Sequence, residues 1–242
     1  NAIRYVPFYE KWAQENNIKD SDIYSLNCLK IFPIVEKEDL REDPLRFISR
    51  KFEAKSLLSL STSGSTGKPV NIFSDIKART FHYAFFTRLR SWYGVSKNDR
   101  RVTFLGRIVV SADKKRPPYW VYDAWNNNLV MSSFHISENN FPFYYEKLRS
   151  FRPKEIFGYA SCIYELAKYI VDKGFEPIEI PLIMPTAETL LPYQREVISR
   201  AFKGCLVNQY GCTEMAFFGS ENNKGNMLMH PEHAIIELLD DM

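Results

Sequence analysis

Residues 155–174 read EIFGYASCIYELAKYIVDKG and predict a strand, a loop and a helix in that order. The strand is the short apolar run at 155–157, and the loop is GYAS at 158–161. A helix is predicted because apolar side chains recur at the spacing i, i+3, i+4, i+7 and i+8. These side chains are Ile163, Leu166, Ala167, Ile170 and Val171, and Gly174 is typical of the end of such a helix.

The same pattern continues toward the C-terminus, with a strand at 180–184, a helix at 192–202 and a strand at 205–209. Strands that alternate with helices predict right-handed βαβ connections and a parallel sheet, and hence an α/β fold. Ligands of open α/β sheets bind beyond the carboxyl ends of the strands. The loops at 158–161, 186–190 and 210–214 should therefore meet at one edge and carry the functional site.

The chain is predicted to divide near residue 50. Residues 1–50 indicate a helical and irregular arm, with a short helix at 36–40, that packs on the main domain. Residues 51–242 are expected to form the α/β core. Its first strands, at 57–60 and 70–73, should pair as a hairpin.

The middle of the chain is predicted to be mixed in secondary structure. A helix should begin at Ser74 or Asp75 and run to about Trp92, with Gly94 at its end. Further strands are expected at 102–105, 119–125 and 129–133.

The composition limits the classes of partner. The chain has 242 residues, and its net charge of +3 is spread along it, which gives no electrostatic footprint for nucleic acid or an anionic membrane. No apolar run approaches the ~18 residues of a membrane span. The four cysteines include no CxxC pair, which favours reduced thiols and a cytoplasmic protein.

The hairpin encloses STSGSTGKP at 61–69, a loop rich in hydroxyl groups and glycine with one lysine. Such a loop can surround a phosphate with backbone N–H groups and side-chain donors. It is not a P-loop, because Thr62 stands where the first glycine is required and Pro69 replaces the serine or threonine. Composition alone is equally typical of a surface loop.

A second candidate stretch is LVNQYGCTE at 206–214. It places the ring of Tyr210, the hydroxyl of Thr213 and the carboxylate of Glu214 within five residues. An aromatic ring can stack on a base, a hydroxyl can bond a phosphate, and a carboxylate can hold Mg²⁺. This combination indicates a nucleotide site.

The two stretches together resemble the signatures of the adenylate-forming superfamily, in which a Ser/Thr/Gly-rich phosphate loop precedes a YGxTE motif. Ala187-Glu188 is similar to the [GS]AE element of its phenylacetate–CoA ligase-like members. MSSFHIS at 131–137 and GYASCIYELAKYI at 158–170 resemble the CapK-like branch linked to capsular polysaccharide biosynthesis. The resemblance extends from about Val6 to the C-terminus.

The resemblance implies a fold and a reaction. The fold is the large N-terminal adenylation domain, with mixed and parallel sheets flanked by helices. In the reaction a carboxylate attacks ATP to form an acyl adenylate, and the acyl group then passes to coenzyme A, to a carrier-protein thiol or to an amine. The expected cofactors are ATP and Mg²⁺, with coenzyme A as co-substrate.

The resemblance also assigns roles to residues of this chain. Thr213 would bond the α-phosphate, Glu214 would bind Mg²⁺, and Lys68 would act in catalysis with them. Tyr210, next to Gly211, would pack on adenine, with Ala187 and Glu188 at its edge. The loop over the β- and γ-phosphates would comprise Ser61, Thr62, Ser63, Gly64, Ser65, Thr66, Gly67 and Lys68.

Four other residues are weaker candidates. His135 and Tyr159 could form the wall of an acyl pocket, although His135 could equally be a core histidine. His230 and His233, at i and i+3, could bind a metal, but a structural role is favoured because no nearby cysteine completes a zinc set.

Members of the superfamily carry a mobile C-terminal domain with a catalytic lysine, and no residue here matches it. Residues 1–242 alone are therefore expected to be slow or inactive in adenylation. The alternative function is a non-catalytic nucleotide-binding or carrier-interacting protein of the same fold.

Overall fold

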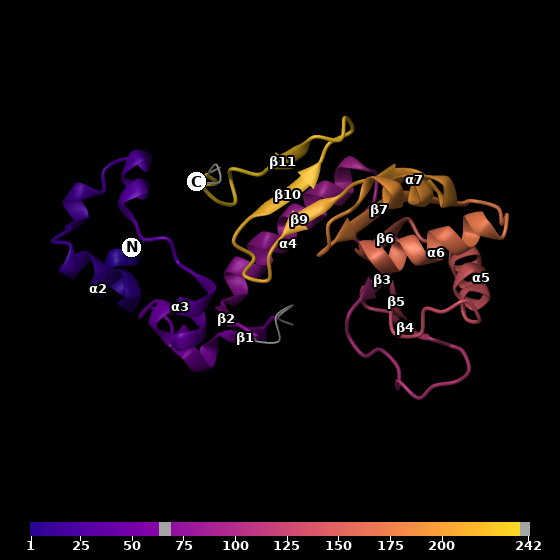
Figure 1. Cartoon of the computed structure of the whole chain (residues 1–242), viewed down its shortest axis with the longest axis horizontal. Helices are drawn as coiled ribbons and strands as arrows, with labels where there is room; N and C mark the ends of the chain where they lie inside the picture. The colour runs from indigo at the N-terminus through magenta and orange to yellow at the C-terminus, as the bar shows by residue number, and fades with distance from the viewer. Residues whose placement is uncertain (63–68, 238–242) are drawn as a thin grey trace. The chain divides into compact units, whose positions relative to one another are not determined.

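The computed structural model describes residues 1–62 and 69–237. These residues form two compact units. The first unit comprises Asn1–Phe81 and Thr213–Met215, and the second comprises His82–Cys212 and the chain from Ala216 onward. The helices and strands are labelled in Figure 1.

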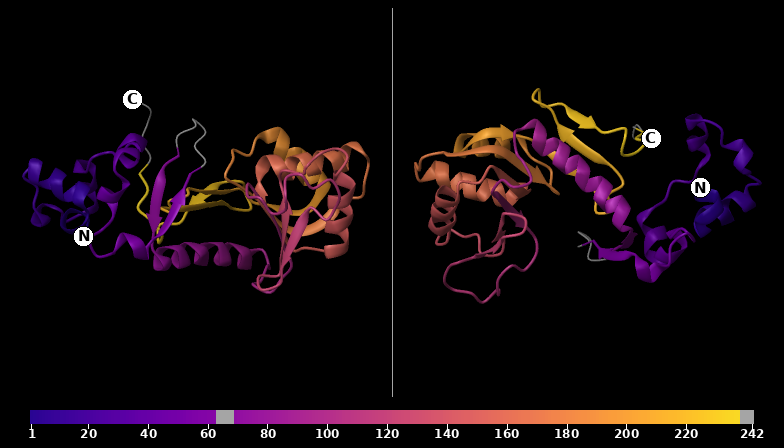
Figure 2. Two further views of the ribbon diagram at one scale, coloured as in Figure 1. Left: turned by 90° about the horizontal axis from the view of Figure 1, so that it is seen from below. Right: turned by 180° about the vertical axis from the view of Figure 1, so that it is seen from behind.

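The first unit consists of short helices and one hairpin. Strands β1 (Leu58–Ser61) and β2 (Asn71–Ser74) pair antiparallel, with Leu60 opposite Ile72, and Figure 2 shows them side by side. The hairpin predicted at 57–60 and 70–73 is therefore confirmed. The α-helices are α1 (Ala2–Tyr5), α2 (Pro7–Glu15) and α3 (Lys37–Glu42), and the 3-10 helices are Asp20–Asp22, Leu26–Ile31, Pro44–Phe47 and Ala54–Ser56.

The second unit is built on a six-stranded sheet of order β4-β5-β3-β6-β7-β8. All neighbours pair in parallel except β4 and β5, which are antiparallel. The α/β fold with a mostly parallel sheet is confirmed. The strands are β3 (Arg101–Leu105), β4 (Trp120–Asp123), β5 (Asn128–Ser132), β6 (Glu155–Tyr159), β7 (Ile178–Thr186) and β8 (Phe202–Leu206).

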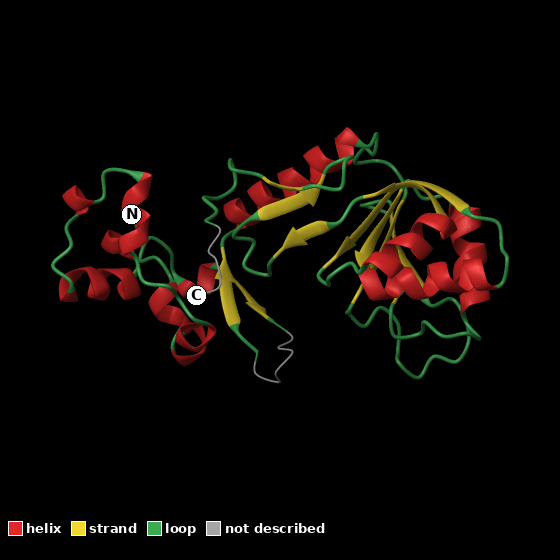
Figure 3. Ribbon diagram, turned by 45° about the horizontal axis from the view of Figure 1, so that its top comes forward, coloured by secondary structure: helices red, strands yellow, loops and turns green. Residues whose placement is uncertain are grey.

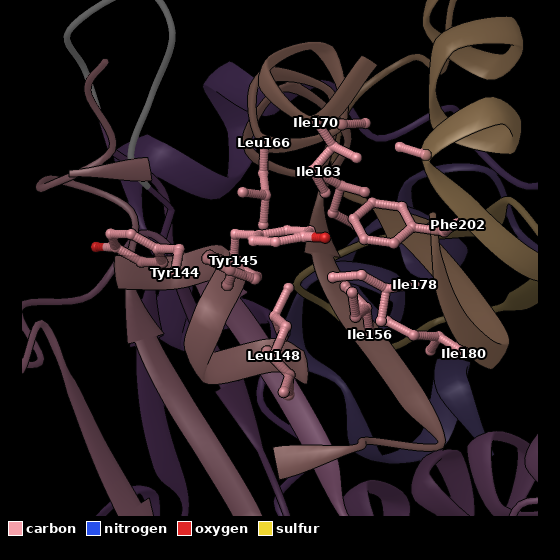
Figure 4. Close-up of a cluster of buried hydrophobic side chains, with 14 of the residues drawn as sticks. Tyr144, Tyr145, Leu148, Ile156, Ile163, Leu166, Ile170, Ile178, Ile180 and Phe202 are labelled. Carbon is pink, nitrogen blue, oxygen red and sulfur yellow. The ribbon is translucent and has the colours of Figure 1, made fainter. Parts of the chain in front are cut away.

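Three helices cover one face of this sheet: α5 (Phe141–Phe151), α6 (Ala160–Asp172) and α7 (Pro192–Ala201) (Figure 3). Their apolar sides bury a common core with the strands. Figure 4 shows side chains of this core, including Tyr145 of α5, Ile163 of α6 and Ile156 of β6. Burial of such side chains is the main favourable term in folding, at about 25 cal/mol per Å².

The other face of the sheet packs against α4 (Ile76–Trp92), of which the part from His82 onward belongs to this unit. Phe86 and Leu89 of α4 share a cluster with Met184 of β7. Phe218 joins the same cluster from a second, antiparallel sheet of order β11-β10-β9. Its strands are β9 (Gln209–Gly211), β10 (Phe218–Glu221) and β11 (Met227–Met229).

Several predicted boundaries are wrong. The segment 158–161, predicted to be a loop, is divided between β6, which runs to Tyr159, and α6, which begins at Ala160. The helix predicted to reach Phe202 ends at Ala201, because Phe202 is extended and starts β8. The strand predicted at 205–209 is two strands, since β8 ends at Leu206 and Gln209 begins β9 in the other sheet. The motif at 210–214 thus starts inside a strand, although it is predicted to be a loop.

Three elements are not among those predicted. Helix α5 carries buried residues at the spacing i, i+3, i+4 and i+7, namely Phe141, Tyr144, Tyr145 and Leu148, so the periodicity needed to find it is present. Strands β10 and β11 are short and have no strong alternation of apolar and polar residues.

Two absences concern the described residues. None of their helices could span a membrane, and their cysteines form no disulfide bond.

A buried ion pair connects α4 to the sheet. Arg90 Nε donates to Glu155 Oε2 at 2.7 Å, and Arg90 Nη2 donates to Glu155 Oε1 at 2.9 Å. The Glu155 side chain is 0% exposed. Loss of one partner would leave a buried charge without its counterion, which is far more costly than loss of an exposed pair.

We predict that Glu155→Ala lowers the free energy of unfolding by about 3–5 kcal/mol, because Arg90 would lose its buried partner. Urea unfolding followed by circular dichroism measures the change. The control is Glu138→Ala, whose side chain is 83% exposed in a 3.9 Å pair with Lys173, and it should change the value by less than about 0.5 kcal/mol. Equal losses in the two variants would contradict the assignment.

A histidine cluster fastens α4 to the segment after β11. His82 Nδ1 lies 3.0 Å from His233 Nε2, so one ring donates to the other. Arg88 Nη2 donates to His230 Nδ1 at 2.5 Å, and Arg88 Nη1 donates to Glu232 at 3.0 Å. Because Arg88 can only donate, the proton of neutral His230 is on Nε2, which faces Ser220 Oγ at 3.2 Å.

Burial and the Arg88 guanidinium lower the pKa of His230 from its ordinary value of 6.5. The hydrogen bond from Arg88 lowers the pKa of Glu232 as well. The unfolded chain therefore binds more protons than the folded chain at His230 as the pH falls below about 6.5, and at Glu232 as it falls below about 4.5, so acid favours unfolding.

We predict that the free energy of unfolding falls as the pH decreases from about 6.5 to 5, and that His230→Gln reduces this slope. Urea unfolding at several pH values gives both quantities. A wild-type stability that does not change over this range, or a slope that is the same in the variant, would refute the assignment.

Candidate functional site

A cavity of about 360 Å³ lies in the second unit, beyond the end of β7 and along β9. It contains four of the residues that the resemblance assigns to the nucleotide. The lining residues are Ala187, Glu188, Thr189, Asn208, Gln209, Tyr210, Gly211 and Met227. The segments 187–189 and 208–211, separate in the sequence, thus form one site.

Tyr210 offers an aromatic surface to this cavity. Its side chain is 53% exposed, and its ring centroid lies 5.1 Å from that of Phe217. Across the strand it faces Gly219, where an added Cβ would come within 2.9 Å of Met229 Sδ and 3.5 Å of Tyr210 Cβ. The glycine therefore leaves room for the Met229 side chain, whereas 3.5 Å to Tyr210 is an ordinary contact distance.

Gln209 holds the tyrosine strand against the end of β7. Thr186 Oγ1 donates to Gln209 Oε1 at 2.5 Å, and Gln209 Nε2 donates to the carbonyl oxygen of Tyr210 at 2.9 Å. Both side chains are buried, which makes such hydrogen bonds costly to break. An added Cβ at Gly211 would meet Gln209 Nε2 at 2.9 Å.

Ala187 and Glu188 form the opposite wall. Ala187 has φ +64°, in the left-handed region that non-glycine residues rarely adopt. The Glu188 carboxylate accepts from the Ser161 backbone N–H at 2.7 Å and from the Ser161 hydroxyl at 3.0 Å. This wall is therefore connected to the first turn of α6.

Asn208 belongs to the cavity although it is not among the predicted site residues. Its backbone N–H donates to Glu221 Oε2 at 2.9 Å, and Arg195 Nη2 donates to both oxygens of the same carboxylate. Its buried Oδ1 has no hydrogen-bond partner among the residues that the structure describes. In the sequence, the only sign that Asn208 belongs to the site is that its side-chain amide lies two residues before Tyr210.

Most of the phosphate loop lies outside the described residues, which exclude 63–68. The roles of Ser63, Gly64, Ser65, Thr66, Gly67 and Lys68 therefore remain predictions. Ser61 ends β1. Thr62 closes the hairpin, because its Oγ1 accepts from the Val70 N–H at 3.0 Å and its N–H donates to the Val70 carbonyl at 3.0 Å.

Thr213 and Glu214 form an exposed turn in the first unit. Glu214 borders a cavity of about 280 Å³ with mainly apolar walls, to which Phe47, Phe52 and Phe73 contribute. No cluster of three or more histidine, cysteine or acidic side chains suited to a metal occurs among residues 1–62 and 69–237. Mg²⁺ at Glu214 would therefore need ligands such as phosphate oxygens and water.

His135 and Tyr159, the weaker pocket candidates, do not border the Tyr210 cavity. His135 is buried, stacks on Tyr119 with ring centroids 4.9 Å apart, and has its Nδ1 2.8 Å from Ser132 Oγ. Tyr159 ends β6 with its hydroxyl beside Gly106, where an added Cβ would lie 2.6 Å from the oxygen. Their role in an acyl pocket stays a prediction.

His230 and His233 take part in the contacts with Arg88 and His82 described above. These contacts give both rings a structural role. Packing of the segment after β11 on α4 thus uses both histidines, as expected for the favoured structural role, and a metal at them stays a hypothesis.

One curated protein aligns with nearly the whole length of this chain. It is 30% identical over 231 residues to Protein CapK of Staphylococcus aureus, covering 95% of this chain and 51% of CapK. The chain therefore spans about half the length of that relative. No protein-family model matches the chain.

The fold is similar to that of 2-hydroxyisobutyryl-CoA ligase. One crystal structure of that enzyme, with 2-HIB-AMP and CoA in the thioesterification state, superposes with a TM-score of 0.68 at 18% identity, covering 94% of this chain and 50% of the ligase. An open conformation with the same ligands gives a TM-score of 0.65 at 17% identity, covering 94% and 55%. The chain is thus similar to CapK in sequence and shares the fold of 2-hydroxyisobutyryl-CoA ligase, in agreement with the resemblance that its motifs indicate.

Proposed function

We propose that this chain carries the nucleotide-binding part of an enzyme that activates a carboxylate with ATP through an acyl adenylate. The single observation that carries the proposal is the 360 Å³ cavity, which Tyr210 and Ala187 line together from separate segments. Its volume lies in the usual range of small-molecule sites. The 2-hydroxyisobutyryl-CoA ligase structures hold 2-HIB-AMP and CoA, which supports adenylate chemistry for this fold.

The cavity suits an adenine base. The half-exposed ring of Tyr210 offers a face for stacking, and the backbone of Ala187 lines the other segment of the wall. Asn208 also lines the cavity, but its Oδ1 is buried and offers no exposed surface for a base to contact.

The family resemblance assigns the phosphate chemistry to Thr213, Glu214 and the loop at 61–68. Thr213 offers a hydroxyl donor and Glu214 an exposed carboxylate, and the loop from Ser61 to Lys68 supplies further donors. When bound, Mg²⁺ would neutralise the charge that develops on the phosphate oxygens. The residues of this chain would orient the phosphates and donate hydrogen bonds to them, which lowers the barrier to attack by an anionic carboxylate.

Coenzyme A is the acyl acceptor that we favour, since the ligase with the same fold was crystallised with CoA. A carrier-protein thiol or an amine remains the alternative acceptor. A protein of the same fold that binds the nucleotide without catalysis is the second candidate function. Carboxylate-dependent ATP–pyrophosphate exchange separates the enzyme from the non-catalytic protein, because only a carboxylate-activating enzyme returns labelled pyrophosphate to ATP.

We predict that Tyr210→Ala weakens binding of ATP by roughly 5- to 150-fold, because stacking of a base on an aromatic ring contributes about 1–3 kcal/mol. Isothermal titration with Mg·ATP measures the change. Tyr193→Ala is the matched control, because Tyr193 is 54% exposed and also packs on an aromatic ring, that of Tyr164. Equal affinities of the Tyr210 variant and the wild type would disprove the base site.

We predict that Glu214→Gln abolishes carboxylate-dependent ATP–pyrophosphate exchange in the whole natural protein, because the neutral amide is a poor ligand for Mg²⁺. Aryl, fatty and amino acids serve as the substrate panel. Glu138→Gln, on an exposed helix-flanking position, should exchange like wild type. Exchange that persists in Glu214→Gln would show that the metal assignment is wrong, and wild-type binding of ATP without exchange would favour the non-catalytic alternative.

A further inference from the structure

Helix α6 begins without a cap of its own. Its N-cap residue, Tyr159, makes no side-chain cap hydrogen bond, and its first turn contains no acidic residue. The first N–H groups of any helix have no intrahelical acceptor, and a negative charge near them is favourable because of the helix dipole. An acceptor from elsewhere in the chain would therefore stabilise this end of the helix.

Glu188 supplies that acceptor from the loop after β7. One carboxylate oxygen accepts from the Ser161 N–H at 2.7 Å and the other from the Ser161 hydroxyl at 3.0 Å. Ser161 is the second residue of α6. Each oxygen of the carboxylate thus already holds a hydrogen bond to the helix.

The residue before Glu188 needs such an anchor. Ala187 has φ +64°, a conformation that persists in a non-glycine residue only where its surroundings enforce it. The chain is held on both sides of Ala187, by Thr186 through Gln209 and by Glu188 through Ser161. These two anchors fix the backbone that lines the cavity.

We infer that Glu188 is a positioning residue that shapes the base site through α6 and does not itself bind the nucleotide. This inference rests on the proposed function for the identity of the ligand. It also explains how a carboxylate can line a cavity for an anionic nucleotide, since its charge is directed at the positive end of a helix. The resemblance alone assigns Glu188 to the nucleotide.

A double-mutant cycle on binding of Mg·ATP tests the inference. Glu188→Ala should weaken affinity about tenfold and Ser161→Ala about threefold. In the Glu188→Ala background Ser161→Ala should have no further effect, because the hydroxyl then has no carboxylate to hold. Glu188→Gln keeps one acceptor and should lose less affinity for Mg·ATP than Glu188→Ala. Glu165→Ala, on the exposed side of the same helix, should bind Mg·ATP like wild type.

Three results would overturn the inference: no effect of Glu188→Ala, no effect of Ser161→Ala in the wild-type background, or additive effects of the two substitutions. Hydrogen exchange of the Ser161 amide without nucleotide is a separate readout. It should accelerate in Glu188→Ala, and unchanged exchange would refute the cap. Failure of the wild type to bind Mg·ATP would instead disprove the proposed function. In that case hydrogen exchange of the Ser161 amide would still show whether Glu188 caps α6.

Discussion

The parallel pairing of β6 with β7 is the constraint on which the site depends. Tyr159 lies opposite Thr186 at the carboxyl ends of the two strands, so the residues that follow each strand leave the sheet side by side. This register brings Ser161 to Glu188 and places Ala187 at the sheet edge. A slip of one residue would turn the side chains of β7 to the opposite faces and separate these groups.

The second constraint is the turn of the chain from one sheet into another after β8. Val207 N–H still bonds to Ile183 of β7, but Asn208 N–H bonds to Glu221 at the end of β10. Tyr210 therefore stands on the antiparallel sheet and faces the loop that leaves the parallel sheet. The cavity exists because two sheets meet there, and Gln209 joins them through Thr186.

Local patterns were sufficient for the parallel sheet, and the family resemblance was sufficient for the grouping of Ala187 with Tyr210. The helix at 163–171 has unambiguous spacing, and the alternation of strands and helices places Ala187 just beyond a strand. Tyr210 was expected beyond a strand of the same sheet, but it lies within β9 of the other sheet. The break at 206–209 could not be predicted, since LVNQ reads as one continuous strand and only long-range partners decide its sheet. The hydrogen bonds of Glu188 and the unsatisfied oxygen of Asn208 likewise depend on residues distant in the sequence.

The central claim is that Tyr210 and its neighbours hold the adenine of ATP. Photolabelling of the chain with Mg·8-azido-ATP, followed by mass spectrometry, tests it most directly. The account predicts that the label enters the peptide with residues 208–211 and that excess ATP suppresses it. Labelling that avoids this peptide, or that excess ATP does not reduce, would contradict the account.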